Sequence, residues 1–423
     1  MASSQKNPWL IALAAVVVLA LLWVRWPSND IGHVEEEIAS SRKTIATVKS
    51  RMTHTQAARQ TPREFVANKD KSDAEPPESE QEPLFEVNGK RFRSLAEAVD
   101  AANPGDTITL TGDAYVRNPV KVRKSLRLDL NGFRLTARNS RIPRIRRANG
   151  DRGAGGHAIS IQGAHDVIIE NGFIDVDSNG GKNGFTGAVE NVPDPQEPNA
   201  QPETVAEAEH PEDANYDVVV RDVEVTSDVM RSSAFLNSDG TMLIDNCKVA
   251  SNGGNGSYTV GADAKTTIRD CEFNTVGEEG WGGWWNNTVA VAFDGTTVVE
   301  SGTYVTKMAE GAEGTAYGTY VFSSGGTIEV RNGEFVADNV VQADKDMNNY
   351  GTDFGASEVV IRDGAFSGKM ESVQVGEESV VMSGASAYGG VYDQQPKQDF
   401  VPEGKSIVAY GDGTYSVENT QVR

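Results

Sequence analysis

One short segment of the sequence gathers side chains of the kinds that bind sugars. Residues 278–287, here called the Trp segment, hold three of the six tryptophans beside carboxylate and amide groups: Glu278, Glu279, Trp281, Trp284, Trp285 and Asn286. Tryptophan rings stack on sugar faces, and carboxylates and amides bond sugar hydroxyls. The segment therefore predicts a glycan-binding site. The alternative is that it packs against the rest of the protein or forms a subunit contact.

A second group of polar residues matches half of a calcium-binding loop. Asp175, Asp177 and Asn179 follow the D-x-D-x-N-G spacing, whose oxygen ligands suit calcium. The twelfth position of the loop is Thr186, so the usual bidentate glutamate is missing. The five histidines show no spacing typical of metal ligands. We therefore expect no cofactor, with calcium at this incomplete site as the alternative.

These residues lie between copies of a repeated phrase that reads apolar, polar, Asn/Asp/Ser, small, variable, then aromatic or Val. Its copies begin with Ile169, Val220, Ile244, Ile268, Val299, Val330 and Ile361, so the spacing is 51, 24, 24, 31, 31 and 31 residues. A recurring period in this range indicates a solenoid. Because the phrases are short, β-rich and separated by Gly and Asn turns, they predict stacked β-strands and not a helical array.

Stacking predicts that equivalent residues of successive coils touch in columns about 4.8 Å apart. An aliphatic column contains Ile244, Ile268, Val299, Val330 and Ile361. An aromatic column contains Phe273, Tyr304, Phe335 and Phe366. A polar column at the turn contains Asn246, Asp270, Ser301, Asn332 and Asp363. The position that follows the polar column, here called the small slot, suits a bend with positive φ or a close approach of the backbone. In nearly every copy it holds a small residue: Gly172, Cys247, Cys271, Gly302, Gly333 and Gly364.

The only two cysteines occupy this small slot in adjacent coils. The simpler interpretation is that Cys247 and Cys271 are stacked, buried thiols that act as small apolar groups. A disulfide is the alternative, since the expected Cα spacing permits it, although parallel Cβ directions make its geometry awkward.

The start of the repetitive region predicts a helical cap. A strand pattern at 84–92 precedes the capping box Ser94–Glu97 and a short helix to about Ala102, followed by a strand at 107–110. A helix placed there would cover the open first coil. Together, FEVNGKRFRSLAEAVDAANPGDTITLTGDAYV and LRLDLNGFRLT resemble the pectate-lyase-like superfamily of right-handed β-helices. The resemblance covers residues 84–417 and implies an all-β, right-handed parallel β-helix over 84–420.

The superfamily contains lyases, hydrolases, adhesins and phage tailspikes, so the resemblance alone does not choose a function. Residues 141–146, RIPRIR, match the R-x-P-x-x-R pattern that supplies the basic arginine in pectate lyases. The calcium-binding acids and other phrases of those enzymes do not accompany it, so a basic loop is the simpler interpretation. We expect no catalytic residue, although carboxylates from different coils could still form a pair.

The amino terminus predicts a membrane anchor. After a tail at 1–8, residues 9–26 form an apolar run with Trp9, Trp23 and Trp26 at its ends, as in a membrane-spanning helix. A cleaved signal peptide is the alternative, but the residues after the run are bulky. Basic residues on both sides leave the orientation open, and we expect the β-helix outside.

A stalk is expected between the anchor and the β-helix. In residues 30–60, apolar or small residues recur in alternating steps of three and four, the pattern of a coiled coil. The stalk predicts a homo-oligomer, either dimer or trimer, whereas a lone amphipathic helix is the alternative. Residues 61–83 are rich in charge and proline and predict a flexible or extended linker.

The formal charge of −22 makes nucleic acid an unlikely ligand class, because such a surface repels phosphates. The whole pattern predicts a single-pass membrane protein on a cell or virion surface. Its β-helix would bind a glycan or a host or cell-surface receptor without catalysis. The alternative is a polysaccharide lyase or glycoside hydrolase.

Overall fold

The computed structural model describes residues 82–138, 156–177, 187–194, 215–227, 233–277, 288–321, 326–345, 358–374 and 384–420. All the described residues belong to the second of two units of the chain, Arg51–Arg423. The expected tail, membrane segment and stalk, and the linker as far as residue 81, lie outside the described residues. Within the described ranges, no helix is long and apolar enough to cross a membrane.

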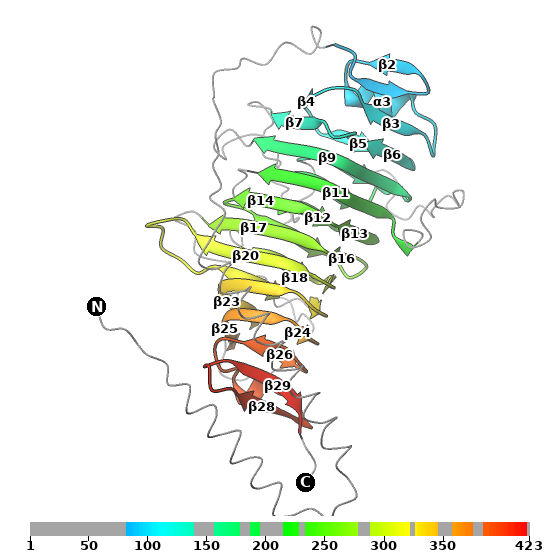
Figure 1. The fold of residues 1–423 in the computed structure, drawn as a ribbon. Coiled ribbons are helices and arrows are strands. Elements are labelled where there is room, and N and C mark those ends of the chain that lie inside the picture. Colours follow the sequence, from blue (N-terminus) through cyan, green and yellow to red (C-terminus); the bar gives the residue numbers. More distant parts are fainter. Residues whose placement is uncertain are drawn as a thin grey trace, which may run out of the picture. The chain divides into compact units, whose positions relative to one another are not determined.

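The described part of the second unit is mostly β-strand, and its strands pair mainly in parallel (Figure 1). The parallel strands form three ladders, named A, B and C. Ladder A contains β3 (Thr107–Leu110), β6 (Leu126–Asp129), β13 (Thr241–Asp245), β16 (Lys265–Arg269), β19 (Thr296–Val299), β22 (Thr327–Val330), β24 (Glu358–Ile361) and β26 (Gly384–Ala387).

Ladder B contains β4 (Ala114–Val116), β7 (Arg134–Arg138), β14 (Lys248–Asn252), β17 (Cys271–Gly277), β20 (Gly302–Met308) and β27 (Val391–Tyr392). Ladder C contains β5 (Val120–Val122), β8 (His157–Gln162), β10 (Gly187–Val192), β12 (Ser233–Asn237), β15 (Asn255–Val260), β18 (Thr288–Phe293) and β21 (Tyr317–Val321). Four longer strands serve two ladders each: β9 (Val167–Asp177) and β11 (Val218–Ser227) in A and B, and β23 (Glu334–Lys345) and β25 (Ala365–Gln374) in B and C. The chain passes through A, B and C in turn, and each pass is one coil.

The predicted aliphatic column is confirmed on ladder A. Ile244 pairs with Ile268, and the register continues through Val299, Val330 and Ile361, one residue in each coil. All five side chains have no exposed surface. Because side chains alternate across a strand, this register places every second residue of ladder A in the interior.

The predicted aromatic column is also confirmed, on ladder B. The ring centroids of Phe273 and Tyr304 are 5.6 Å apart, and those of Tyr304 and Phe335 are 4.7 Å apart. Phe335 and Phe366 stack at 5.4 Å. The column continues to Tyr392, whose ring lies 5.1 Å from that of Phe366. Each side chain is fully buried, so the column forms part of the interior of five coils.

The bend after ladder A takes two forms, of which the sequence predicted one. Gly302, Gly333 and Gly364 have φ of 129°, 138° and 136°, as expected for the small slot. In the cysteine coils the positive φ belongs instead to the preceding residue, with 48° at Asn246 and 51° at Asp270. Asn and Asp tolerate this left-handed conformation, which frees the small slot for a cysteine.

The cysteines themselves are free and buried. The backbone N–H of Cys247 donates to Sγ of Cys271 at 3.4 Å, and each thiol donates to a backbone carbonyl of the preceding coil. Burial and the Cys271 neighbour raise the pKa of the Cys247 thiol well above its usual value. Cys247 is therefore present as a protonated thiol, and the alternative disulfide is not formed in the structure.

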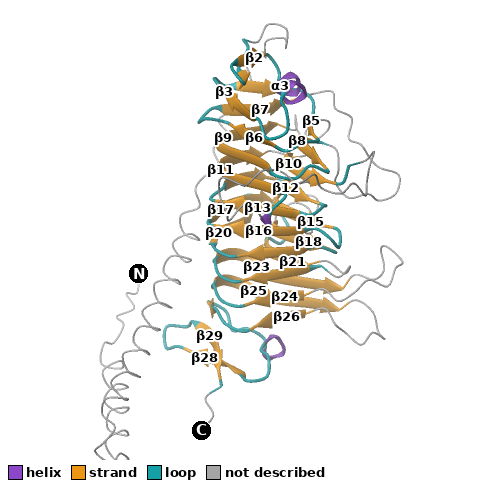
Figure 2. Cartoon of the chain, turned by 90° about the vertical axis from the view of Figure 1, so that its right-hand side faces the viewer, coloured by secondary structure: helices purple, strands orange, loops and turns teal. Residues whose placement is uncertain are grey.

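Both ends of the ladders are closed by other elements. The predicted capping box is present at Ser94, and it starts α3 (Leu95–Ala101) (Figure 2). Leu95 and Val99 of α3 line a small apolar cavity together with Ile108 and Leu128 of ladder A, so the helix covers the interior of the first coils. β1 (Phe85–Val87) pairs antiparallel with β2 (Lys90–Phe92) and with β3. At the other end, β29 (Tyr415–Asn419) pairs antiparallel with β27 and with β28 (Lys405–Ala409).

Candidate functional site

The Trp segment lies outside the described residues, but the strands that hold its two ends are described. It joins the end of β17 in ladder B to the start of β18 in ladder C. At its start Gly277 pairs with Met308 of the next coil, and at its end Thr288 pairs with Tyr317. Both ladders are therefore in register on either side of the segment.

The coil does not need the Trp segment in order to close. In the preceding coil residues 253–254 alone connect β14 to β15, and in the following coil residues 309–316 connect β20 to β21. The Trp segment makes the same connection with residues 278–287. Loops that exceed what a rigid scaffold requires are common places for binding residues.

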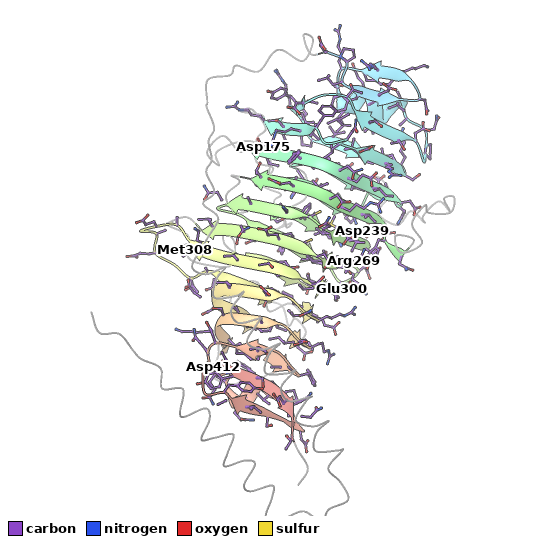
Figure 3. The ribbon with its side chains drawn as sticks, viewed as in Figure 1. Asp175, Asp239, Arg269, Glu300, Met308 and Asp412 are labelled. Atoms are coloured by element: carbon purple, nitrogen blue, oxygen red, sulfur yellow. The ribbon has the colours of Figure 1, made fainter. Side chains whose placement is uncertain are left out.

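The residues of the predicted calcium site are not seen as a ligand set. Asp175 lies on β9, where its carboxylate accepts a hydrogen bond from the Thr226 hydroxyl and lies 3.8 Å from Nη1 of Arg134 (Figure 3). Asp177 ends the strand, its backbone paired with Arg138, and Asn179 lies outside the described residues. In the part of the chain that the structure describes, no group of three or more His, Cys, Asp or Glu side chains could hold a metal ion.

The described residues also contain a polar cluster at the turns, here called the His–Asp corner: His165, Asp217, Asp239 and Thr241. These residues come from three successive coils, at the turns between ladder C and ladder A. Nδ1 of His165 lies 2.5 Å from Oδ1 of Asp217. The other oxygen, Oδ2, accepts from the backbone N–H of Thr241 at 2.7 Å and from its hydroxyl at 2.8 Å.

A glycine makes this arrangement possible. Gly240 has φ of 51°, and a Cβ at that position would lie 2.3 Å from Oδ2 of Asp217. Any side chain there would displace the carboxylate from Thr241. The Asp217 carboxylate is thus held by the imidazole of His165 and by Thr241. It fits there because Gly240 has no side chain that would occupy the same space.

The two carboxyl groups of the corner differ in their electrostatic surroundings. Burial alone would raise the pKa of Asp217, but the hydrogen bonds from His165 and Thr241 outweigh it and lower that pKa. Burial and the charge of Asp217 raise the pKa of Asp239. Asp217 is therefore ionised, while Asp239 is the more readily protonated neighbour. Carboxyl groups whose pKa values are shifted in opposite directions can serve as base and acid in proton transfer.

No protein-family model, no curated protein and no solved structure matches this chain. The resemblance to the pectate-lyase-like superfamily thus remains a prediction. Function has to be argued from the side chains themselves, since a fold alone does not specify one.

No sequence motif marks the His–Asp corner, because its residues are far apart in the chain. His165 and Asp217 are separated by 52 residues, and Asp239 lies 22 residues further on. Aligning the repeat copies could have found part of it. Asp217 precedes Val218 in one coil and Thr241 precedes Met242 in the next, and Val218 pairs with Met242, so Asp217 and Thr241 occupy equivalent positions.

Another charged column, on the outer side of ladder A, has a structural explanation. Glu170 is 2% exposed and bonds the guanidinium groups of Arg127 and Arg221. Further along, Arg269 makes two bonds to Asp245, at 2.7 and 2.9 Å. In Figure 3, Arg269 lies on the same edge of the strands as Glu300 and Asp239. Because acids and arginines of neighbouring coils neutralise each other, this column stabilises the stacking and is not a free ligand site.

The Asp217 contacts predict an acid-sensitive stability. Asp217→Asn should lower the free energy of unfolding at neutral pH and flatten its fall at acid pH. A lowered folded-state pKa gives stability that is present above the unfolded value, about 3.9, and is lost as the pH falls through the folded value. Asp239→Asn is the matched control and should not destabilise at neutral pH, since burial disfavours its charge. Urea unfolding at several pH values measures both, and equal losses in the two variants would contradict the assignment.

Proposed function

We propose that the chain is a single-pass membrane protein of a cell or virion surface, with its three ladders as the faces of a right-handed parallel β-helix. Residues 9–26 would anchor it, and the coiled coil at 30–60 would hold it as a dimer or trimer. The β-helix would present the Trp segment to a glycan or a host or cell-surface receptor, without catalysis. The observation that carries the proposal is the position of this tryptophan-rich connection between strands that are in register with the next coil.

The scaffold around the segment supports binding more than packing. The Phe273 ring in the coil of the segment and the Tyr304 ring in the next coil are fully buried and in contact with each other. Three tryptophans are therefore not needed there to complete the interior. A rigid support also lowers the conformational entropy that a binding loop loses when it meets its ligand.

Replacing Trp281, Trp284 and Trp285 together by Ala should abolish measurable glycan binding by the full chain in detergent. Buried tryptophans at binding sites commonly contribute at least about 2 kcal/mol each, which is about 30-fold in Kd. A glycan array identifies the ligand, and titration of that ligand measures Kd.

The matched control for this experiment is Tyr388→Ala. Tyr388 is 37% exposed and lies under the guanidinium of Arg362. Its loss therefore removes a surface aromatic ring elsewhere in the second unit. The control should bind like the unmodified chain. Unchanged binding by the triple variant would rule out the Trp segment as the site.

The second candidate function is a polysaccharide lyase or glycoside hydrolase, and the His–Asp corner favours it. Hydrolysis or elimination needs a base and an acid close together, and His165 held by Asp217 beside Asp239 supplies both types. If this function is present, the chain should release reducing or unsaturated sugars from a polysaccharide panel, and His165→Gln should abolish the release. Product release that His165→Gln leaves unchanged would exclude the corner as its source.

A further inference from the structure

The bend at Asn332–Gly333 differs from the other Asn–Gly bends in how its side chain is held. Asn332 is exposed, and within the described ranges its amide makes no hydrogen bond. In contrast, Nδ2 of Asn131 donates to the Leu110 carbonyl at 3.1 Å, and Nδ2 of Asn88 donates to Asp106 at 2.8 Å. The Asn332 side chain alone among these three is free to rotate.

We propose that Asn332 is a site of spontaneous deamidation in the folded protein. In this reaction the backbone nitrogen of the following residue loses its proton to solvent base and bonds to Cγ of the asparagine. The bond between Cγ and Nδ2 breaks and ammonia leaves, which closes a cyclic imide. Water then opens either imide carbonyl to give aspartate or isoaspartate. A following glycine favours ring closure because it has no side chain to obstruct the approach.

The same bend one coil further on shows the approach that the reaction needs. The backbone N–H of Gly364 donates to Oδ1 of Asp363, its own preceding side chain, at 2.8 Å. Gly333 and Gly364 have nearly the same φ, 138° and 136°. The backbone form shared by the two bends therefore allows an Asn332 side chain to fold over the amide of Gly333.

Asn131–Gly132 is held in the opposite way and serves as the internal reference. Asn131 has φ of 50°, and its side chain bonds Leu110. The backbone nitrogen of Gly132 donates to the Asn171 carbonyl at 2.6 Å. Both reacting groups must leave a hydrogen bond before the ring can close, so this bend is protected by the fold.

The two products would affect the coil differently. Asp222, Asp270 and Asp363 already occupy the equivalent slot of other coils, so aspartate fits there. Isoaspartate adds a carbon atom to the main chain between β22 and β23. It would shift the register of the Phe335 coil against its neighbours, because the ladders pair residue by residue on both sides.

The test is incubation of the full chain in mildly alkaline buffer, with peptide mapping by mass spectrometry over time. We expect deamidation at Asn332 to be about 30-fold faster than at Asn131, the ratio that corresponds to about 2 kcal/mol of activation free energy. In urea the two rates should converge, since both sequences are Asn–Gly. Asn332→Ser, which copies Ser301 of the preceding coil, should lose the product while keeping the unfolding midpoint.

Two results would overturn the proposal. One is a folded protein in which Asn332 keeps its amide as long as Asn131 does. The other is a rate ratio that stays the same in urea, because the difference would then not come from the fold.

Discussion

Phe335→Ala should lower the free energy of unfolding by about 3–5 kcal/mol, the usual cost of removing a buried phenylalanine. Phe335 has no exposed surface and lies between two rings, with centroid distances of 4.7 Å to Tyr304 and 5.4 Å to Phe366. Removing its ring leaves a cavity within the column and breaks two aromatic contacts, each worth about 0.5–1.5 kcal/mol beyond burial. Urea unfolding of the variant and the unmodified chain measures the difference.

The control for this variant is Phe173→Ala. Phe173 is partly exposed on the outer side of ladder B, with the Arg134 guanidinium 5.0 Å from its ring centroid. Its loss removes a cation–π contact of about 0.5–1 kcal/mol and leaves no enclosed cavity. If Phe173→Ala proves as damaging as Phe335→Ala, the aromatic column is not a main source of stability.

Gly364→Ala should destabilise the chain by about 3 kcal/mol through the backbone. Gly364 has φ of 136°, which costs a side-chain-bearing residue of order 1–3 kcal/mol. A Cβ there would also lie 2.8 Å from the Gly333 carbonyl oxygen and 3.0 Å from the Phe366 ring. Two neighbouring coils would have to move apart to accept it, and thermal or urea unfolding should show the loss.

Gly384→Ala is the matched comparison, in the next coil. No heavy atom lies within 4 Å of the Cβ it would add, and its φ is not in the left-handed range. Its effect should stay within about 0.5 kcal/mol. A similar loss at both glycines would mean that the bend conformation does not limit the Gly364 position.

The repeat predicted the interior of the coils well because one rule governs it. Residues one period apart must touch, so the positions of Ile244 and Ile268, or of Phe335 and Phe366, follow directly from the alignment of the phrases. The capping box at Ser94 was equally predictable, because it depends on residues only three positions apart.

The features that were missed depend on more than local sequence. The bend switches from positive φ at Asp270 to positive φ at Gly302 in the very next coil, although the phrases align without a gap. The His–Asp corner needs His165 to reach a carboxylate in another coil, and a periodic alignment of strands says nothing about side chains in the turns. The expected anchor, stalk and Trp segment remain predictions.

The two-residue connection between β14 and β15 has a consequence for how such a protein can change over generations. If a coil can turn from one ladder to the next with residues 253–254 alone, the length and content of the corresponding turn after β17 are under little folding constraint. Lineages could then exchange the Trp segment for unrelated sequences, while the inward-facing residues stay unchanged. Selection on the sequence of this turn and selection for thermal stability would act on separate parts of the same gene.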